Sequence, residues 1–383
     1  MKINPRILNP IKELAESGKL SGILLLTATA VSLCLSNSSY SEAYISLWEQ
    51  QIGFSFLVTS INHWINDGLM VFFFLLVGLE IKREILKGEL SSIRHSLLPI
   101  IAAIGGMVFP ALIYFSFNAQ TGDLKGWAIP IATDIAFSLG ILSLLGNRVP
   151  FGLKVFLTAL AIIDDLGAIF IIATFFSTEL HFDKLLFAFL ILSVLVGFNR
   201  MRVSKLPLFI LLGIPLWYCI LQSGVHATLA GVLLAFTIPL SKIEALEHHL
   251  HRPVNYLILP LFALANTAIA VPFEYLRLIA FSSVSLGIVS GLFFGKPIGI
   301  FLFSLITIKA KLTQLPKSVN WAHLIGVGFT AGIGFTMSIF IANLSFDNGA
   351  TLNISKLSVL FGSLFSAIMG LIILRIQPKG TND

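Results

Sequence analysis

Charged residues and cysteine are what this sequence has little of. Asp, Glu, Lys and Arg make up 11% of its 383 residues, against about 25% in soluble domains. A soluble fold of this size needs more polar side chains than that to cover its surface. Its two cysteines, Cys34 and Cys219, lie far apart in apolar stretches, which excludes a disulfide framework and a cysteine-ligated metal site. The shortage of charge therefore predicts a protein that resides in a lipid bilayer.

Long apolar runs are what the sequence has instead, since 56% of its residues are hydrophobic. A membrane-spanning helix needs about 20 predominantly apolar residues. We expect an all-α polytopic membrane protein in which residues 1–383 form one transmembrane domain. Its amphipathic segment 1–19 would hold a short interfacial helix that starts at Pro10, after Asn9 as N-cap. The twelve predicted spans are 20–36, 61–81, 95–117, 124–145, 150–176, 184–199, 206–220, 222–239, 254–272, 284–308, 323–346 and 357–374.

The basic residues indicate how these spans are oriented. When the loops are assigned alternately to the two sides, 20 of the 25 Lys and Arg fall on the side of the N-terminus and 4 on the other. Basic residues favour the cytoplasmic side, so both termini are predicted to be cytoplasmic. The net charge of +6 forms no stripe or patch along the sequence, which argues against binding of nucleic acid.

Four ionisable residues lie at the centres of predicted spans: Asp134 in the fourth, Asp164 and Asp165 in the fifth, and Lys296 in the tenth. A charge there costs at least about 2.5–3.5 kcal/mol, so a functional site is the first expectation. The alternative is a structural role as hydrogen-bonding groups between helices. Adjacent aspartates point about 100° apart on a helix and repel each other when both are ionised. In such a pair, protons and a cation compete for the same oxygens.

An inverted repeat relates two parts of the chain. The segment 135–141 matches 333–339 at an offset of 198 residues, and Pro99 falls on Pro297 at the same offset. The repeat units, about 95–176 and 284–374, start an odd number of spans apart. The second unit is therefore expected to be upside down in the membrane.

Spans four and eleven are expected to be interrupted helices. Thr133 and Asp134 follow Pro130, and the matching part of span eleven is rich in glycine; both sequences are poor helix interiors. Interrupted helices at corresponding places of inverted halves indicate the binding site of a transporter. The broken ends would present two positive and two negative ends of helix dipoles. We expect Asp134 to compensate the positive pair and Lys296 the negative pair.

Five segments of the sequence are similar to the NhaA family of bacterial sodium–proton antiporters: 74–84, 133–137, 161–169, 223–231 and 295–300. The resemblance extends from the first predicted span to the last. It implies an electrogenic exchange in which Na⁺ or Li⁺ leaves the cell and more than one H⁺ enters, by alternating access and without a cofactor. It also implies the bacterial inner membrane and a homodimer, joined by an outside β-hairpin near residues 52–56.

The resemblance implies a role for each central residue. Asp165 would be the principal ligand of the cation, and Asp164 would release the cation on protonation and pair with Lys296. Thr133 and Asp134 would belong to the crossing of the interrupted helices. A sixth residue, Asp67, would lie in the outward funnel, although its position also fits the N-cap of a helix.

The family's pH response implies a further cluster. Its candidates are Glu80, Arg83, Glu84, His226, Glu247, His248 and His251, and histidine titrates in the physiological range. The alternatives are that charges at a span end are ordinary topology markers, and that His226 is a packed residue of span eight. Glu244 stands where a basic residue is expected and so departs from the family's pattern.

Three other functions also use buried carboxylates. An intramembrane aspartyl protease needs a Tyr-Asp and a Gly-x-Gly-Asp pattern, and neither occurs in the predicted spans. A proton or cation channel needs no inverted repeat. A related symporter would differ in the direction in which protons move when sodium is added.

Overall fold

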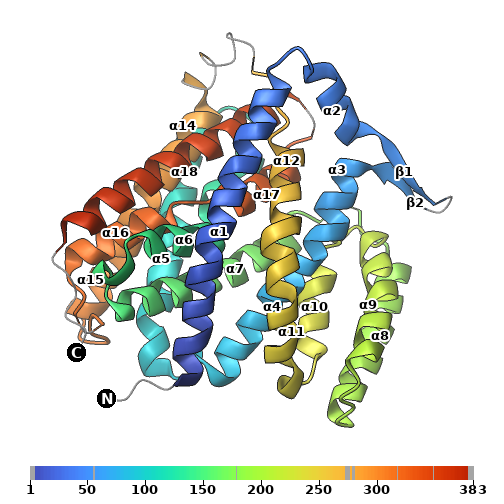
Figure 1. Cartoon of the computed structure of the whole chain (residues 1–383), viewed down its shortest axis with the longest axis horizontal. Coiled ribbons are helices and arrows are strands. Elements are labelled where there is room, and N and C mark those ends of the chain that lie inside the picture. Colours follow the sequence, from blue (N-terminus) through green and yellow to red (C-terminus); the bar gives the residue numbers. More distant parts are fainter. Residues whose placement is uncertain are drawn as a thin grey trace. The chain divides into compact units, whose positions relative to one another are not determined.

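The computed structural model describes residues 5–54, 57–177, 179–271, 277, 281–316, 318–347 and 349–377. They form helices and one antiparallel hairpin, built from β1 (Gln51–Phe54) and β2 (Leu57–Ser60) (Figure 1). Within the hairpin Gln51 pairs with Ser60, and Ile52 pairs with Thr59. The helical class and the hairpin are as predicted. Residues 1–4 of the predicted N-terminal segment lie outside the described residues.

Helix occupies every predicted span range. The helices of the described chain are α1 (Pro5–Ser36), α2 (Ser41–Glu49), α3 (Ile61–His63), η1 (Trp64–Leu69), α4 (Met70–Lys87), η2 (Glu89–Ser91), α5 (Ile93–Asn118), η3 (Leu124–Ile131), α6 (Ile135–Leu144), η4 (Gly146–Arg148), α7 (Phe151–Phe175), α8 (Phe182–Arg200), α9 (Leu206–Leu221), α10 (Leu229–Thr237), α11 (Leu240–Pro253), η5 (Val254–Ile258), α12 (Leu259–Asn266), α14 (Ser283–Ser290), η6 (Gly291–Gly295), α15 (Lys296–Lys309), α16 (Trp321–Ala331), α17 (Phe335–Ser345) and α18 (Ala350–Ile376).

Not all of these helices are long and apolar enough to cross a membrane on their own. Six stretches of the described chain are: Ser96–Asn118, Leu124–Leu144, Phe151–Phe175, Phe182–Arg200, Ser283–Lys309 and Ala350–Ile376. Two bent pairs, Leu20–Ser36 with Ser41–Glu49 and Trp321–Ala331 with Phe335–Ser345, raise the number to eight if each pair is one span. The count of twelve and the inverted repeat therefore stay predictions.

The structure corrects the sequence analysis in three places. Asn9 and Pro10 lie inside α1, which begins at Pro5; a proline so near a helix start removes few hydrogen bonds. The range 222–239 is helical only from Leu229, because residues 222–228 form turns in which Gly224 has a φ of 82°. Residues 240–253, expected to be a loop, form α11, since buried Ile243, Leu246 and Glu247 recur at helical spacing.

The chain divides into two compact units. Unit 1 comprises Met1–Thr27, Gly88–Ala168 and Ala270–Asp383, and unit 2 comprises Ala28–Lys87 and Ile169–Ile269. Each has its own hydrophobic core, with Leu157 and Val327 among the buried residues of unit 1, and Leu79 and Leu234 among those of unit 2. The single transmembrane domain expected from the sequence stays a prediction.

In unit 1, glycines bring α5 and α15 into backbone contact. A Cβ atom on Gly105 would lie 2.3 Å from the carbonyl oxygen of Gly299, and a Cβ atom on Gly299 would lie 2.0 Å from that of Gly105. Any larger residue at either position would push the helices apart. This contact holds α15, which begins with Lys296, against α5.

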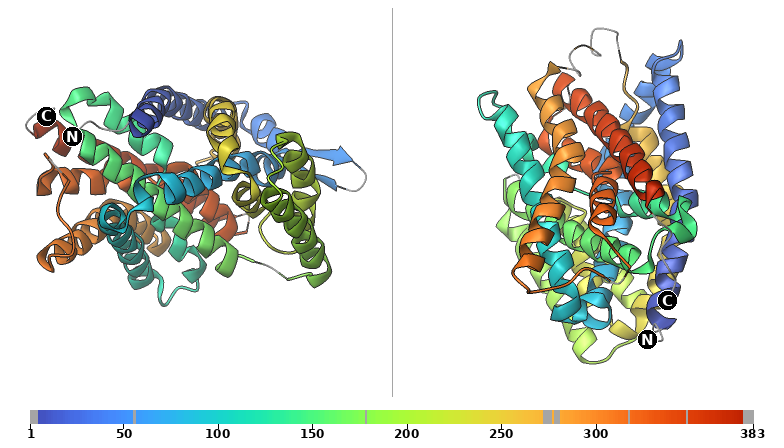
Figure 2. Two further views of the ribbon diagram at one scale, coloured as in Figure 1. Left: turned by 90° about the horizontal axis from the view of Figure 1, so that it is seen from below. Right: turned by 90° about the vertical axis from the view of Figure 1, so that its left-hand side faces the viewer.

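In unit 2, glycines do the same for α4 and α10. A Cβ atom on Gly231 would lie 2.3 Å from the carbonyl oxygen of Val71, and one on Gly78 would lie 2.8 Å from the Cβ atom of Ala235. Two other helices of this unit, α8 and α9, lie side by side and are yellow-green in Figures 1 and 2. Of this pair, α4 carries Glu80, Arg83 and Glu84, which are described below.

The close approach of α4 and α10 predicts that Gly231→Ala destabilises the protein. The new methyl group has to displace the backbone of α4, at a cost of about 1–3 kcal/mol, and we expect a lower unfolding midpoint in detergent. The matched control is Gly197→Ala in α8, where a Cβ atom would meet nothing within 4 Å. Equal midpoints for the two variants would contradict the close packing of α4 on α10.

Candidate functional site

Two interrupted helices meet in unit 1. The first breaks at residues 132–134, between η3 and α6, and the second at residues 332–334, between α16 and α17, where the axis bends by 46°. The chains hydrogen-bond at the breaks: the Asp134 N–H donates to the Ile333 carbonyl at 2.7 Å, and the Thr133 hydroxyl lies 2.8 Å from the Ala331 carbonyl. The two breaks predicted from Pro130 and the glycines therefore lie next to each other.

The Asp134 carboxylate caps the N-termini of two helices. Its Oδ1 accepts from the Phe137 N–H at 2.9 Å, at the start of α6. Its Oδ2 accepts from the N–H and the hydroxyl of Thr336, at 3.1 Å and 2.5 Å, in the first turn of α17. A carboxylate there satisfies unpaired N–H groups and interacts favourably with the positive ends of both helix dipoles. Asp134 is 2% exposed, so these bonds replace all of its contact with water.

Serine side chains, which the sequence analysis missed, complete this crossing. Ser138 of α6 donates to the Thr330 carbonyl near the end of α16, and Ser338 of α17 donates to the Ile129 carbonyl in η3, at 2.8 Å and 2.7 Å. Ser363 of α18 accepts from the N–H groups of Gly334 and Phe335. The first two serines lie in the matched segments 135–141 and 333–339, and this was the available signal.

Asp164 and Lys296 form a buried ion pair in unit 1. The Lys296 Nζ atom lies 2.5 Å from Asp164 Oδ2, and both side chains are 0% exposed. The Thr133 hydroxyl lies 2.8 Å from the same oxygen. Among the described residues, Asp164 Oδ1 accepts no hydrogen bond. The structure thus brings Lys296 to Asp164, and the Thr133 hydroxyl links this ion pair to the crossing of the interrupted helices.

Asp165 lies beside this pair on α7 and is 2% exposed. Carboxylate, hydroxyl and carbonyl oxygens are the ligands that hard cations prefer, and Asp164, Asp165 and Thr133 supply two of these kinds. No group of three or more His, Cys, Asp or Glu suited to a metal ion occurs in the described part of the chain.

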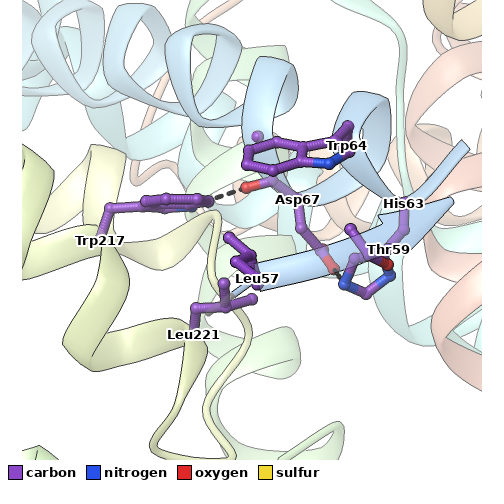
Figure 3. A pocket seen from close by; sticks show the side chains of 8 residues that line it. Leu57, Thr59, His63, Trp64, Asp67, Trp217 and Leu221 are labelled. Carbon is purple, nitrogen blue, oxygen red and sulfur yellow. Dashed lines mark hydrogen bonds and ion pairs between the residues drawn. The ribbon is translucent and has the colours of Figure 1, made fainter. Parts of the chain in front are cut away.

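Two further residues selected from the sequence, Asp67 and His226, lie together in unit 2. His63 Nε2 lies 2.8 Å from one carboxylate oxygen of Asp67, and His226 Nε2 lies 3.2 Å from the other. The Trp217 indole N–H donates to the Asp67 carbonyl at 2.8 Å. Figure 3 shows Asp67 between His63 and Trp217, with Trp64 beside them. Asp67 lies within the π-helix η1, so the N-cap interpretation is wrong; the side-chain cap is Ser60, at the start of α3, the helix that precedes η1.

This cluster lines a small pocket. The residues that line it are Leu57, Thr59, His63, Trp64, Asp67, Gly68, Trp217 and Leu221 (Figure 3). Neither His63 nor Trp217 was selected from the sequence. The spacing of His63 and Asp67, four residues apart, was a usable signal for the first. Trp217 comes from α9, and only the fold brings it here.

A third group joins α4 to α11 within unit 2. Arg83 forms an ion pair with Glu247 and a second with Glu84 at 3.2 Å. His251 Nε2 lies 3.4 Å from Glu80 Oε1. His248 is exposed on α11 and lies outside these contacts. Five of the six predicted cytoplasmic candidates thus meet, whereas the sixth does not.

Burial raises the pKa of Glu247 to about 8. The Arg83 guanidinium opposes this shift, and the carboxylates of Glu80, Glu84 and Glu244 add to it. Since burial penalises the charged form, the Glu247 carboxyl takes up a proton on folding at neutral pH. Glu247 is therefore a group whose charge changes between neutral and alkaline pH.

The raised pKa of Glu247 predicts that alkaline pH weakens the folded state. A carboxyl group whose pKa is about 8 in the folded protein, against an ordinary value of 4.5, stabilises the folded state most fully below pH 4.5. This contribution is lost as the pH rises through 8. We expect Glu247→Gln to reduce the fall in unfolding midpoint between pH 6 and pH 9 by about 2 °C or more. Glu49→Gln, which alters an exposed carboxylate of α2, is the control. An unchanged pH dependence in Glu247→Gln would disprove the assignment.

Comparisons with known proteins agree on one family. The model of the family described as Na⁺/H⁺ antiporter 1 matches residues 12–374. The chain is 51% identical over 378 residues to the Na⁺/H⁺ antiporter NhaA 2 of Flavobacterium johnsoniae, covering 96% of this chain and 92% of that protein. It is 48% identical over 380 residues to the Na⁺/H⁺ antiporter NhaA of Bordetella parapertussis, covering 94% and 95%. With that of Flavobacterium psychrophilum it shares 45% over 382 residues, covering 98% of each.

Proposed function

The chain belongs to the Na⁺/H⁺ antiporter 1 family, and on this premise we propose that it exports Na⁺ or Li⁺ in exchange for H⁺ at the pair Asp164 and Asp165. Members of this family are transporters and not enzymes, which removes the aspartyl protease from consideration. The proposed place of action is the bacterial inner membrane, with both termini cytoplasmic. The proposed assembly is a homodimer joined through the hairpin of β1 and β2.

The observation that carries the proposal is the state of the Asp164 carboxylate. One of its oxygens is held by the Lys296 ammonium and the Thr133 hydroxyl, and the other accepts no hydrogen bond within the described residues. A buried carboxylate needs a positive partner to stay ionised. Lys296, a proton and a sodium ion can each supply that charge, and in the proposed mechanism they compete for this carboxylate. Competition of this kind couples cation release to proton uptake.

The presence of two carboxylates supports an electrogenic exchange. A monovalent cation bound between ionised Asp164 and Asp165 leaves when protons take its place, and two carboxylates accept up to two protons. Inward movement of two H⁺ against one Na⁺ carries a net positive charge into the cell. More than one proton per cation is therefore the expected ratio.

The crossing of the interrupted helices supports alternating access. Non-helical backbone at membrane depth persists only where it is buried or lines a cavity, and here Thr133, Asp134 and the serines hold it. The proposed movement exposes the aspartate pair first to one side and then to the other. In the proposed cycle Asp67 lies in the outward funnel.

We further propose that the group of Glu80, Arg83, Glu84, Glu247 and His251 makes the exchange depend on cytoplasmic pH. The ion pair of Arg83 with Glu247 and the contact of His251 with Glu80 join α4 to α11, and a second ion pair joins Arg83 to Glu84 within α4. Burial raises the pKa of Glu247 to about 8. His226, which contacts Asp67 from the turn region 222–228, is proposed to modulate the pH response. His248 is exposed, and we propose at most an indirect contribution from it.

Replacing the principal ligand tests the proposed site. In everted membrane vesicles with a proton gradient reported by a dye, Asp165→Asn should reduce Na⁺-driven and Li⁺-driven proton movement by about tenfold or more, because a charged ligand is lost. The control is Asp183→Asn, which alters a carboxylate with 63% exposure at the start of α8. Normal exchange in Asp165→Asn would refute the site. Sodium current without proton countermovement in the parent protein would indicate a channel instead.

Removing the Thr133 hydroxyl tests its contact with Asp164. Thr133→Val keeps the shape and loses a hydrogen bond to a charged group, worth about 1.5–3 kcal/mol. We expect the half-saturating Na⁺ concentration to rise by about tenfold, while Thr133→Ser stays near the parent value. Both are measured in the same vesicle assay at a fixed pH. The same half-saturation in the Val and Ser variants would show that the hydroxyl does not contribute.

A further inference from the structure

The carbonyl groups at the C-terminal end of α10 are held by side chains of two other helices of unit 2. Lys82 of α4 donates to the carbonyls of Phe236 and Ile238 at 2.7 Å and 2.6 Å, and its Nζ atom lies 3.5 Å from that of Ala235. Asn199 of α8 donates to the Thr237 carbonyl at 2.8 Å. The last carbonyls of a helix have no partner within the helix. Four consecutive carbonyls thus receive hydrogen bonds from outside α10.

The chemistry of Lys82 fits this place closely. An ammonium group has three donors and no acceptor, and three carbonyl oxygens surround it. The end of a helix also carries the negative end of its dipole, which favours a cation. Lys82 is 7% exposed, so its charge is balanced by carbonyl dipoles rather than by water. Such a cage of backbone carbonyls is how proteins coordinate small monovalent cations.

Lys82 lies between two groups of the same helix that face α11. Glu80 contacts His251, and Arg83 contacts Glu247. Adjacent residues of a helix point about 100° apart, so Lys82 reaches α10 while Arg83 reaches α11. The last turn of α4 is therefore held on two sides. Just before this turn, Gly78 packs directly against Val232 and Ala235 of α10. The last turn of α4 is therefore the end of a continuous contact between α4 and α10.

We propose that Lys82 is a positioning residue for the pH response: its ammonium, held by the carbonyls that end α10, fixes the last turn of α4 and with it the contact of Arg83 with Glu247. The proposal rests on the proposed pH regulation and names the part of the fold that sets it. Within the described residues of unit 2, Lys82 is not a partner in the ion pairs of Arg83. Its effect passes through the position of α4.

The charged groups near this turn determine the direction of the effect. They are Glu80, Arg83 and Glu84 on α4 and Glu244, Glu247 and His251 on α11; the described residues of α10 include no ionisable side chain. Arg83 is the group that lowers the pKa of Glu247, against burial and the other carboxylates. If Arg83 is held less firmly, Glu247 keeps its proton to higher pH. The loss of Lys82 should therefore move the pH profile to the alkaline side.

The test measures Na⁺-driven proton exchange in everted vesicles between pH 6 and pH 9. Lys82→Met keeps an unbranched side chain that is one atom shorter and removes all three donors, and we expect its half-maximal pH to rise by about half a unit or more. Lys82→Arg keeps the charge and some donors, so a smaller shift is expected. Lys87→Met removes the same charge from an exposed site of the same helix and should leave the profile unchanged. If Lys82→Met does not accumulate, Lys82→Gln, which keeps two donors, takes its place.

The outcomes separate this inference from the proposed pH regulation. Equal shifts in Lys82→Met and Lys87→Met would mean that only charge matters and would overturn the positioning role. An unchanged profile in Lys82→Met, beside a shifted profile in Glu247→Gln, would overturn it too while leaving the regulation intact. Unchanged profiles in both Lys82→Met and Glu247→Gln would refute the regulation and, with it, the inference. A shift in Lys82→Met that Lys82→Arg partly reverses supports it.

Discussion

One carboxylate, that of Asp134, makes the interrupted helices of unit 1 possible. Both α6 and α17 begin at a break in apolar surroundings, and the first N–H groups of each helix have no partner of their own. Asp134 accepts from both helices at once, and its charge faces two positive dipole ends. An unpaired buried polar group costs about 1–3 kcal/mol. Without Asp134, the N–H groups of Phe137 and Thr336 and the Thr336 hydroxyl would each lose this partner.

The rest of the crossing follows the same rule. Thr133, Ser138 and Ser338 meet carbonyls at the ends of the opposite chain, and Ser363 accepts from two N–H groups. Thr133 has a second partner in Asp164, and so the backbone break and the ion pair with Lys296 share one hydroxyl. The proposed cation site is thus attached directly to the least regular backbone of the unit, where a movement requires few helical hydrogen bonds to break.

In unit 2, ionic contacts join neighbouring helices. Helices α4 and α10 are held together by glycine contacts and by Lys82 at the end of α10. The Asp67–His226 contact joins the residues that precede the two helices. The ion pairs of Arg83 then connect α4 with α11. Burial raises the pKa of Glu247, the partner of Arg83, to about 8, whereas the glycine contacts do not depend on pH. Packing therefore holds α4 against α10, and an ion pair joins α4 to α11.

The sequence by itself determined the class of the molecule and the identity of its central residues. Costly charges in apolar runs single out Asp134, Asp164, Asp165 and Lys296, since water cannot stabilise them there. Pro130 and the glycines of span eleven mark the two breaks, because both residue types disfavour a helix. The family resemblance implied that Lys296 pairs with Asp164, and the structure has this contact. Only the tertiary structure decided that Ser363 and Trp217 reach distant backbone, and that His226 lies in a turn beside Asp67. These are contacts between residues far apart in the chain, and local sequence patterns carry no information about which distant group satisfies a buried donor or acceptor.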